Sequence, residues 1–555
     1  MKQLEDALKR QLNEDQAITY PDFDEMWTHI EQAESDSSWL QAGRASAIPR
    51  RPRSWSKIAA VVSLSVLVAA APVYAAIHYD WGNLLRSNEG IQAALDQNLG
   101  QHLGQSITKD GVTLTLQTAI VDENRTVILY SLDVGKHRET DFWNVKGMTL
   151  KGTNSSYKEG EYNYEQWDEE NQRYNGYFES DWTPGQDTAK IILTADAIDL
   201  KTVQSKELPL NPASPEVQSF NIGREGMRKI DVQPLVQNKD KLLLLGEVTF
   251  DDPLAKAWVY PQIAAYNGTT MVKELPGGTF GEPGDHGEYK LKHFLKADEI
   301  TPGQTRFKLQ YWKQERSIPG PWSFELELSK KQMESGTIIK KLDVPVEPGD
   351  TSNTIEKMVI TPTQIRLSIR YKGNGAQEQM PYKKSFLLVD GRTLKSGFYY
   401  GYSTEDPNLI TIRFERPAGL LVDEGTPITF VGKYKVTIHT EDKAPTLLKN
   451  ISTEKQTLIR DVGGYPVEWT YYMQGKDLYI ETGSDDPHFG GINQTNMGGK
   501  YNDPLGKPVT TNFREDGNNK AIDVYKNFKG TEASVYMYFY TTDDPDKETR
   551  VQLQP

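Results

Sequence analysis

The chain has 555 residues with a formal net charge of −14, and it contains no cysteine. The absence of cysteine excludes disulfide bonds, thiolate metal sites and thiol chemistry. The acidic balance argues against direct binding of nucleic acid, which requires a basic surface. A chain of this length forms several domains rather than one large core.

Two amphipathic helices are predicted within residues 1–43. Apolar residues recur at helical spacing in both, so each helix carries an apolar stripe on a charged surface. The second helix begins at Pro21, where Asp22 and Glu25 have the spacing of a capping box. The stripes consist of Leu4, Leu8 and Leu12 in the first helix and of Phe23, Met26, Trp27 and Ile30 in the second.

So short a segment cannot bury two such stripes well, which predicts that they bind a partner. Two alternatives stay open: a helical hairpin packed on itself, and a helix lying on the membrane surface. The second is the weaker alternative, because anionic lipid repels the many acidic residues of this segment. The expected partner has basic and apolar surfaces, as a DNA-binding or polymerase-binding protein has.

A membrane helix is predicted at residues 58–77, twenty residues without a charge. At 1.5 Å per residue it spans roughly 30 Å, the thickness of a bilayer core. The linker of residues 44–57 before it is basic and places the amino terminus in the cytoplasm, through Arg50, Arg51, Arg53 and Lys57. The alternative is a cleaved secretion signal, because small residues follow Pro72. The patterned segment that precedes it favours a retained anchor.

The chain beyond the membrane segment is predicted to be mainly β, after a helical neck over residues 78–104. In residues 111–134, apolar residues alternate with polar ones, the chain turns at Asp122–Asn124, and a second strand returns. Similar ribbons begin at Met227, Thr354 and Gly464, and closing strands are expected at 188–200 and 320–332. This spacing is typical of tandem immunoglobulin-like β-sandwiches. The predicted modules cover residues 105–220, 221–347, 348–445 and 446–555.

Two stretches carry a family resemblance: "NEGIQAAL" at Asn88–Leu95 and "DGVTLTL" at Asp110–Leu116. With the membrane segment before them, they resemble the Gram-positive membrane proteins known as domain of unknown function 4179. Residues 355–371 and 387–394 resemble the immunoglobulin-like domain often found at the carboxyl end of that family. The resemblance implies an anti-sigma factor that holds an extracytoplasmic-function sigma factor at the membrane. It brings no site residues, and the His-Cys-Cys zinc site of many anti-sigma domains is missing here.

The sequence predicts no enzyme, no metal site and no cofactor. Its eight histidines show neither an HExxH motif nor a recurring ligand spacing, and they are expected at the surface. Aromatic clusters at residues 157–178 and 397–402 suit stacking on cell-wall sugars, but packing within strands and turns is the favoured explanation. No ligand from the envelope can be named from them.

These observations favour a single-pass regulator in the cell membrane. Its cytoplasmic helices would sequester a sigma factor, and its extracytoplasmic β modules would sense the envelope. The alternative is a cell-surface binding or adhesion protein of tandem β-sandwiches, whose cytoplasmic segment is incidental.

Overall fold

The computed structural model describes residues 81, 84–86, 88–151, 162–237, 241–283, 288–372, 381–396, 401–402, 406, 408–498, 504–510 and 519–555. All of them belong to the second of two compact units, Val66–Pro555. The predicted inner helices, the basic linker and the membrane helix lie outside the described residues. So do the candidate partner-binding residues Leu4, Leu8, Leu12, Phe23, Met26, Trp27 and Ile30 and the basic residues Arg50, Arg51, Arg53 and Lys57.

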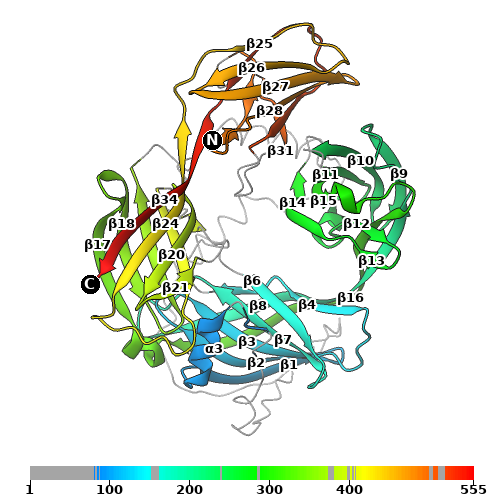
Figure 1. Cartoon of the computed structure of the whole chain (residues 1–555). Coiled ribbons are helices and arrows are strands. Elements are labelled where there is room, and N and C mark those ends of the chain that lie inside the picture. The colour runs from blue at the N-terminus through cyan, green and yellow to red at the C-terminus, as the bar shows by residue number, and fades with distance from the viewer. Residues whose placement is uncertain are drawn as a thin grey trace, which may run out of the picture. The chain divides into compact units, whose positions relative to one another are not determined.

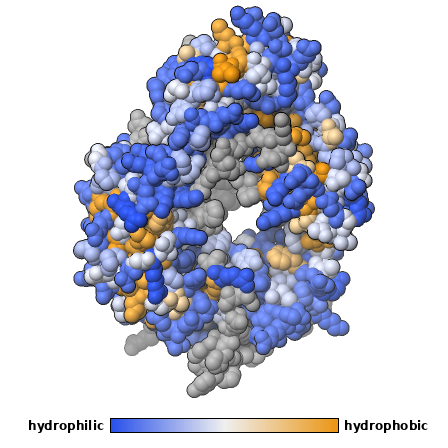
Figure 2. Space-filling model, viewed as in Figure 1, coloured by the Kyte–Doolittle hydropathy of each residue, from blue (hydrophilic) through white to orange (hydrophobic). Residues whose placement is uncertain are grey.

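The described part of the chain is mainly β, as the sequence predicts, with many antiparallel sheets and few helices. The face seen in Figure 2 is mostly hydrophilic, with hydrophobic residues in smaller patches. One α-helix is described, α3 (Glu89–Asp96), and it lies within the predicted neck. Short 3₁₀ turns are η1 (Pro253–Ala257), η2 (Ala297–Glu299) and η3 (Lys331–Gly336).

Three sheets form the first half of the described chain, and all their pairings are antiparallel. In spatial order, the first sheet contains β1 (Gln101–Lys109), β2 (Val112–Val121), β3 (Thr126–Asp133), β7 (Arg173–Ser180) and β6 (Tyr162–Asp168). The second contains β13 (Thr270–Met271), β12 (Gln262–Asn267), β16 (Thr305–Ser329), β8 (Thr188–Leu208) and β4 (Asp141–Lys146), with β5 (Thr149–Lys151) also on β8. The third contains β14 (Glu274–Pro283), β15 (Tyr289–Lys296), β11 (Lys241–Phe250), β10 (Met227–Gln237) and β9 (Gln218–Arg224).

The second half of the described chain forms four further sheets. The fourth sheet contains β17 (Ile338–Glu347), β18 (Asp350–Ile360), β19 (Gln364–Tyr371), β23 (Leu409–Glu415) and β22 (Gly401–Tyr402). The fifth contains β21 (Arg392–Lys395), β20 (Tyr382–Val389), β24 (Ile428–His439), β34 (Tyr540–Gln554) and β29 (Phe489–Ile492). The sixth contains β25 (Thr446–Leu448), β33 (Ala533–Met537) and β30 (Thr495–Asn496). The seventh contains β26 (Gln456–Val462), β27 (Tyr465–Gln474), β28 (Asp477–Gly483), β32 (Ala521–Tyr525) and β31 (Lys507–Thr510).

Two long strand pairs each serve two hydrophobic cores. Strands β8 and β16 pair along almost their whole length, from Thr188↔Ser329 to Leu208↔Phe307. One end of β16 places Trp322 in the core against the first sheet, and the other end places Phe307 in the core against the third sheet. Strands β24 and β34 are the corresponding pair in the second half, and Figure 1 shows β34 in red beside β24 in yellow. Each half is therefore one sandwich with a second sandwich inserted between two of its strands.

A glycine permits the close pairing at the bend of β16. The strand register shifts between Pro319 and Trp322. A Cβ atom on Gly320 would lie 2.5 Å from the carbonyl oxygen of Ala195 in β8. Only glycine allows this approach of two backbones, so a single strand can pass from one core to the other without losing its partner.

One histidine corrects the expectation that all histidines lie at the surface. His293 in β15 is 1% exposed. Its Nε2 accepts a hydrogen bond from the backbone N–H of Ile263 at 3.0 Å, and its Nδ1 lies 3.0 Å from Oε1 of Glu274. The ring is tolerated in the core because both nitrogens have partners, which sequence spacing does not reveal.

A buried acid in the last sandwich makes its stability depend on pH. Asp523 in β32 is 3% exposed, and its Oδ2 accepts hydrogen bonds of 2.6 Å from the backbone N–H and the hydroxyl of Thr495. Burial raises the pKa of Asp523 to about 6, above the value of 3.8 expected in the unfolded chain. Between these two values the folded state binds the proton more tightly. We therefore expect this group to stabilise the fold as the pH falls from 7 to 4, by up to about 3 kcal/mol.

The measurement is thermal unfolding of wild type and Asp523→Asn at pH 7 and pH 5. Wild type should gain stability relative to the variant at the lower pH, because asparagine does not titrate. The matched control is Asp461→Asn, which changes an exposed acid in β26 of the same sheet and should leave the pH dependence unchanged. Parallel curves for wild type and Asp523→Asn would contradict the assignment.

Candidate functional site

Helix α3 is fixed on the outer face of the first sheet. Its side chains Ile91 and Ala94 are fully buried, and they pack in one cluster with Val127, Leu129 and Tyr177 of the sheet. The same cluster includes three residues that precede the helix, Trp81, Leu84 and Leu85, and Met333 of η3. The segment that follows the predicted membrane helix is therefore packed against the β region.

Gly90 brings α3 against the second half of the chain. A Cβ atom at this position would lie 1.7 Å from the carbonyl oxygen of Thr363 and 2.7 Å from its carbonyl carbon. Thr363 belongs to the turn between β18 and β19, whose backbone closes by a hydrogen bond from Thr361 N–H to the Gln364 carbonyl at 2.9 Å. The glycine of the "NEGIQAAL" stretch is thus needed for a contact between backbones.

The turn between β2 and β3 reaches the same place from the first half. Asp122 closes this turn, because its Oδ1 accepts hydrogen bonds from the backbone N–H groups of Asn124 at 2.7 Å and Arg125 at 3.0 Å. The side-chain amide of Asn124 then donates to the carbonyl oxygens of Val359 at 3.3 Å and Gln364 at 3.4 Å. The predicted turn at Asp122–Asn124 is confirmed, and it is a contact surface.

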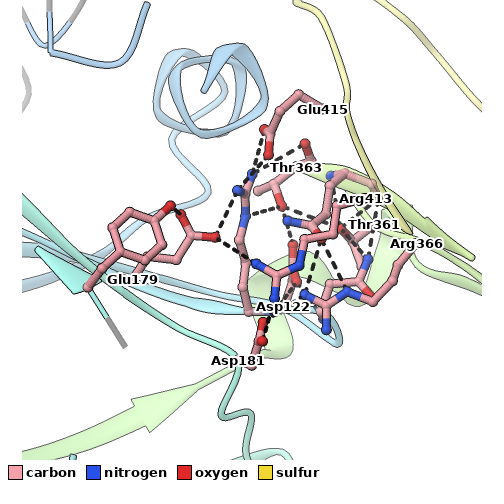
Figure 3. Close-up of polar contacts among 12 residues, drawn as sticks. Asp122, Glu179, Asp181, Thr361, Thr363, Arg366, Arg413 and Glu415 are labelled. Carbon is pink, nitrogen blue, oxygen red and sulfur yellow. Dashed lines mark hydrogen bonds and ion pairs between the residues drawn. The ribbon is translucent and has the colours of Figure 1, made fainter. Parts of the chain in front are cut away.

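Arg125 is the centre of the contact. Its side chain is 1% exposed, and its guanidinium makes two hydrogen bonds of 2.8 Å to the carboxylate of Glu415 and one of 3.3 Å to Glu179. Its Nε donates to the hydroxyl of Thr363 at 3.1 Å, and that hydroxyl donates to Oδ2 of Asp122 at 2.6 Å. Figure 3 shows Glu179 at the left of this cluster and Glu415 at its top. One cation thus joins β7 of the first half to β23 of the second.

In a second set of ion pairs, the acid belongs to the first half and the arginines belong to the second half. Asp181, just after β7, receives a hydrogen bond of 3.0 Å from Arg366 and a further bond from Arg413, both of which belong to the second half. Arg413 also lies 3.9 Å from Glu179. Arg125 of the first half therefore pairs with an acid of the second half, and two arginines of the second half pair with an acid of the first half. We call Asp122, Arg125, Glu179, Asp181, Thr363, Arg366, Arg413 and Glu415 the junction.

The electrostatics of the junction favour a specific contact rather than a strong one. Burial lowers the pKa of Arg125, and the charges of Glu415 and Glu179 more than reverse this effect, so its pKa is raised and it stays protonated. Removing such charges from water costs several kcal/mol for each ion, which their mutual attraction then offsets. When the two halves separate, water solvates the same groups again. The junction can therefore open at a smaller cost than an apolar interface of similar size.

The chemistry of the junction is that of a contact between halves. Within the described ranges, no group of three or more histidine, aspartate or glutamate side chains is placed to hold a metal ion. The described helices include none that is long and apolar enough to cross a membrane. The candidate residues of the inner helices lie outside the described part, so the structure brings none of them together.

Comparisons with known proteins match a short part of the chain. Residues 50–133 match the family described as Domain of unknown function (DUF4179), as the resemblance at Asn88–Leu95 and Asp110–Leu116 predicts. This range includes the basic flank, the predicted membrane segment, α3 and the β2–β3 turn with Arg125. No curated protein matches the chain.

One solved structure is similar over a longer range. Its title is "The crystal structure of the conserved domain protein from Bacillus anthracis", and it is 12% identical over 58% of this chain and 92% of its own. The TM-score is 0.16, which is too low for the likeness to carry a conclusion about this chain.

Proposed function

We propose that the chain is a single-pass regulator in the cell membrane, an anti-sigma factor whose cytoplasmic helices sequester an extracytoplasmic-function sigma factor. One observation carries the proposal beyond the sequence pattern: the segment after the predicted membrane helix is docked at the junction, through Gly90 and Thr363. A change that opens the junction would break the contact of α3 with Thr363, and α3 is joined to the predicted membrane helix by a short piece of chain. A conformational change in the outer β region could therefore be passed through α3 to the membrane helix and the inner helices.

The inner segment supplies the partner-binding side of the proposal. Its two stripes, with Leu8 in the first and Trp27 in the second, suit a partner that covers both. The acidic character of residues 1–43 suits the basic surface of a protein that binds DNA or polymerase. The basic residues from Arg50 to Lys57 support an orientation with this segment in the cytoplasm. The mainly β region then lies outside, where it meets the envelope.

The test is binding of sigma factors by the full chain in detergent micelles. Each extracytoplasmic-function sigma factor of the source cell is titrated against wild type and Trp27→Ala. One of them should bind wild type, and Trp27→Ala should weaken that binding by about 2 kcal/mol, because truncation empties the pocket of a buried aromatic anchor.

The matched control is Trp39→Ala, which removes the same side chain from the same segment outside the stripes and should leave the affinity unchanged. Equal binding by wild type and Trp27→Ala would contradict the proposed binding surface. The anchor has its own check, since amino-terminal sequencing of the mature protein should find residue 1. A mature chain that begins near Ala76 would end the proposal, because the inner helices would then be absent.

A further inference from the structure

A pocket opens on the first sandwich, away from the residues of the junction. Its volume is about 670 Å³, within the range of sites that bind small molecules. It is lined by the segment that leads into β4 and by the paired strands β6 and β7. Part of the aromatic cluster at residues 157–178 is found here, in Tyr164, Trp167 and Tyr174.

Aromatic rings form one wall of the pocket. His137 stacks on Trp167 with ring centroids 3.8 Å apart and an angle of 21° between the planes. Tyr174 meets Trp167 edge-on at 5.1 Å, and its hydroxyl donates to the carbonyl oxygen of Asp141 at 2.8 Å. Trp167 is only partly buried, whereas the ring of Tyr164 lies on the opposite face of β6, where it meets Tyr177. Contacts among the rings therefore fix the wall, and an aromatic face is left accessible to a ligand.

Glu165 places a buried carboxylate in the same pocket. It is 5% exposed, and its Oε1 accepts three hydrogen bonds, from the Tyr130 hydroxyl at 2.7 Å, the Val145 N–H at 2.9 Å and the Asn163 amide at 2.7 Å. Among the described residues, none donates a hydrogen bond to its Oε2. Burial raises the pKa of Glu165, and the three hydrogen bonds and the charge of Lys201 oppose this effect. One oxygen is saturated and fixed, while the other lacks a donor.

The charges around the pocket select the sign of its ligand. The lining includes four carboxylates, those of Glu139, Asp141, Glu165 and Glu169, and none of the described lining residues is lysine or arginine. Two cations lie near this lining: Arg138 is bound to Asp141 through Nε at 3.0 Å, and the charge of Lys201 acts on Glu165. The four carboxylates outnumber them. An anionic ligand such as a phosphate is therefore repelled. A cation is attracted both by the carboxylates and by the faces of the aromatic rings.

We propose that this pocket binds a small organic cation, whose ammonium group donates a hydrogen bond to Oε2 of Glu165 and whose body lies against the aromatic wall. This inference goes beyond the proposed function and does not depend on it. The shared chemistry is an ammonium group of any source, on an amino sugar or on a simple alkylamine. A neutral sugar lacks the charge that the pocket is built to balance.

The test is calorimetric titration of the full chain in detergent micelles with glucosamine, N-acetylglucosamine and n-propylamine at neutral pH. Glucosamine and N-acetylglucosamine form a matched pair, because acetylation removes the charge and keeps the sugar ring. We expect at least one of the two amines to bind, and N-acetylglucosamine to bind at least tenfold more weakly than glucosamine. If only n-propylamine binds, the ligand is a simple alkylamine rather than an amino sugar, and the proposal stands.

Two variants locate the binding. Glu165→Gln keeps the shape of the side chain and the acceptor for the three donors, but it places an N–H₂ group where Oε2 lies, so amine affinity should fall at least tenfold. Trp167→Ala removes a partly buried ring of the aromatic wall and should lower the affinity about threefold to tenfold. The control, Glu325→Gln, changes an exposed acid in β16 of the same sandwich and should change nothing. Measurable and equal binding of the two sugars, no amine binding up to roughly 10 mM, or unchanged affinity in a folded Glu165→Gln protein would each overturn the proposal.

Discussion

Replacement of Arg125 by methionine is expected to lower the free energy of unfolding by about 3–5 kcal/mol. The variant keeps most of the volume of the side chain but removes the charge that Glu179 and Glu415 face at 3.3 Å and 2.8 Å. Glu179 is 2% exposed and would be left as a buried carboxylate without that partner's charge. The measurement is denaturant unfolding of the full chain in micelles, followed by tryptophan fluorescence.

The control is Arg228→Met, because Arg228 and Asp251 form an ion pair of 2.6 Å in which both side chains are about 60% exposed. Breaking a pair of this kind costs less than about 1 kcal/mol. Glu415→Gln in the Arg125→Met background should recover part of the loss, since it removes one of the unbalanced charges. A loss for Arg125→Met no larger than that for Arg228→Met would show that the junction is not closed in solution.

Gly90→Ala is expected to destabilise the docking of α3 by about 3 kcal/mol, although alanine is the better helix former. Helix propensity alone favours alanine over glycine by about 1 kcal/mol. The added methyl group, however, would lie 1.7 Å from the carbonyl oxygen of Thr363, and a backbone atom cannot rotate away as a side chain can. The measurement is hydrogen exchange at residues 89–96, where protection should fall steeply.

Gly185→Ala serves as the matched control for this substitution. No atom lies within 4 Å of a Cβ built on Gly185, and its φ angle is outside the left-handed region. The same chemical change should therefore leave protection of α3 unaltered. If Gly90→Ala leaves protection unchanged or raises it, as helix propensity alone predicts, the close contact with Thr363 does not exist. Under the proposed function, Gly90→Ala should also alter the activity of a sigma-dependent reporter, and Gly185→Ala should not.

Local β structure could be predicted well from the sequence. In residues 111–134 the alternation of Val112, Leu114 and Leu116 with threonine gave the buried face, and the polar turn gave the position of the reversal. The ribbons beginning at Met227, Thr354 and Gly464 are likewise found as the pairs β10–β11, β18–β19 and β27–β28. Alternation of apolar and polar residues predicts which face of a strand is buried, and a turn predicts that the next strand pairs with the one before it.

Pairing between distant strands could not be predicted in this way. The closing strand expected at residues 188–200 continues to Leu208, through a stretch in which polar residues hide the alternation. Its partner β16 begins at Thr305, and nothing in the alternation of either strand identifies the other. The prediction of four consecutive modules therefore leaves out the insertion of one sandwich into another.

The junction was missed for a related reason. Asp122 and Arg125 lie in a polar turn, which a sequence normally places in solvent. Their burial depends on a second turn more than two hundred residues away, around Thr363. The signals that were present are a glycine inside a helical stretch and an arginine beside a buried strand. Both are weak without knowledge of what lies opposite.

The insertion of one sandwich into another also sets the order in which the chain can fold. Strand β24 ends at His439, and its partner β34 begins at Tyr540, about a hundred residues later. At typical rates of synthesis this separation lasts roughly 5–20 s. During that time the sandwich of the fourth and fifth sheets lacks a strand, and the edge of β24 is left unpaired. Strand β34 can pair with β24 only after the inserted sandwich has been synthesised, so completion of the older part of the chain waits for its newest residues.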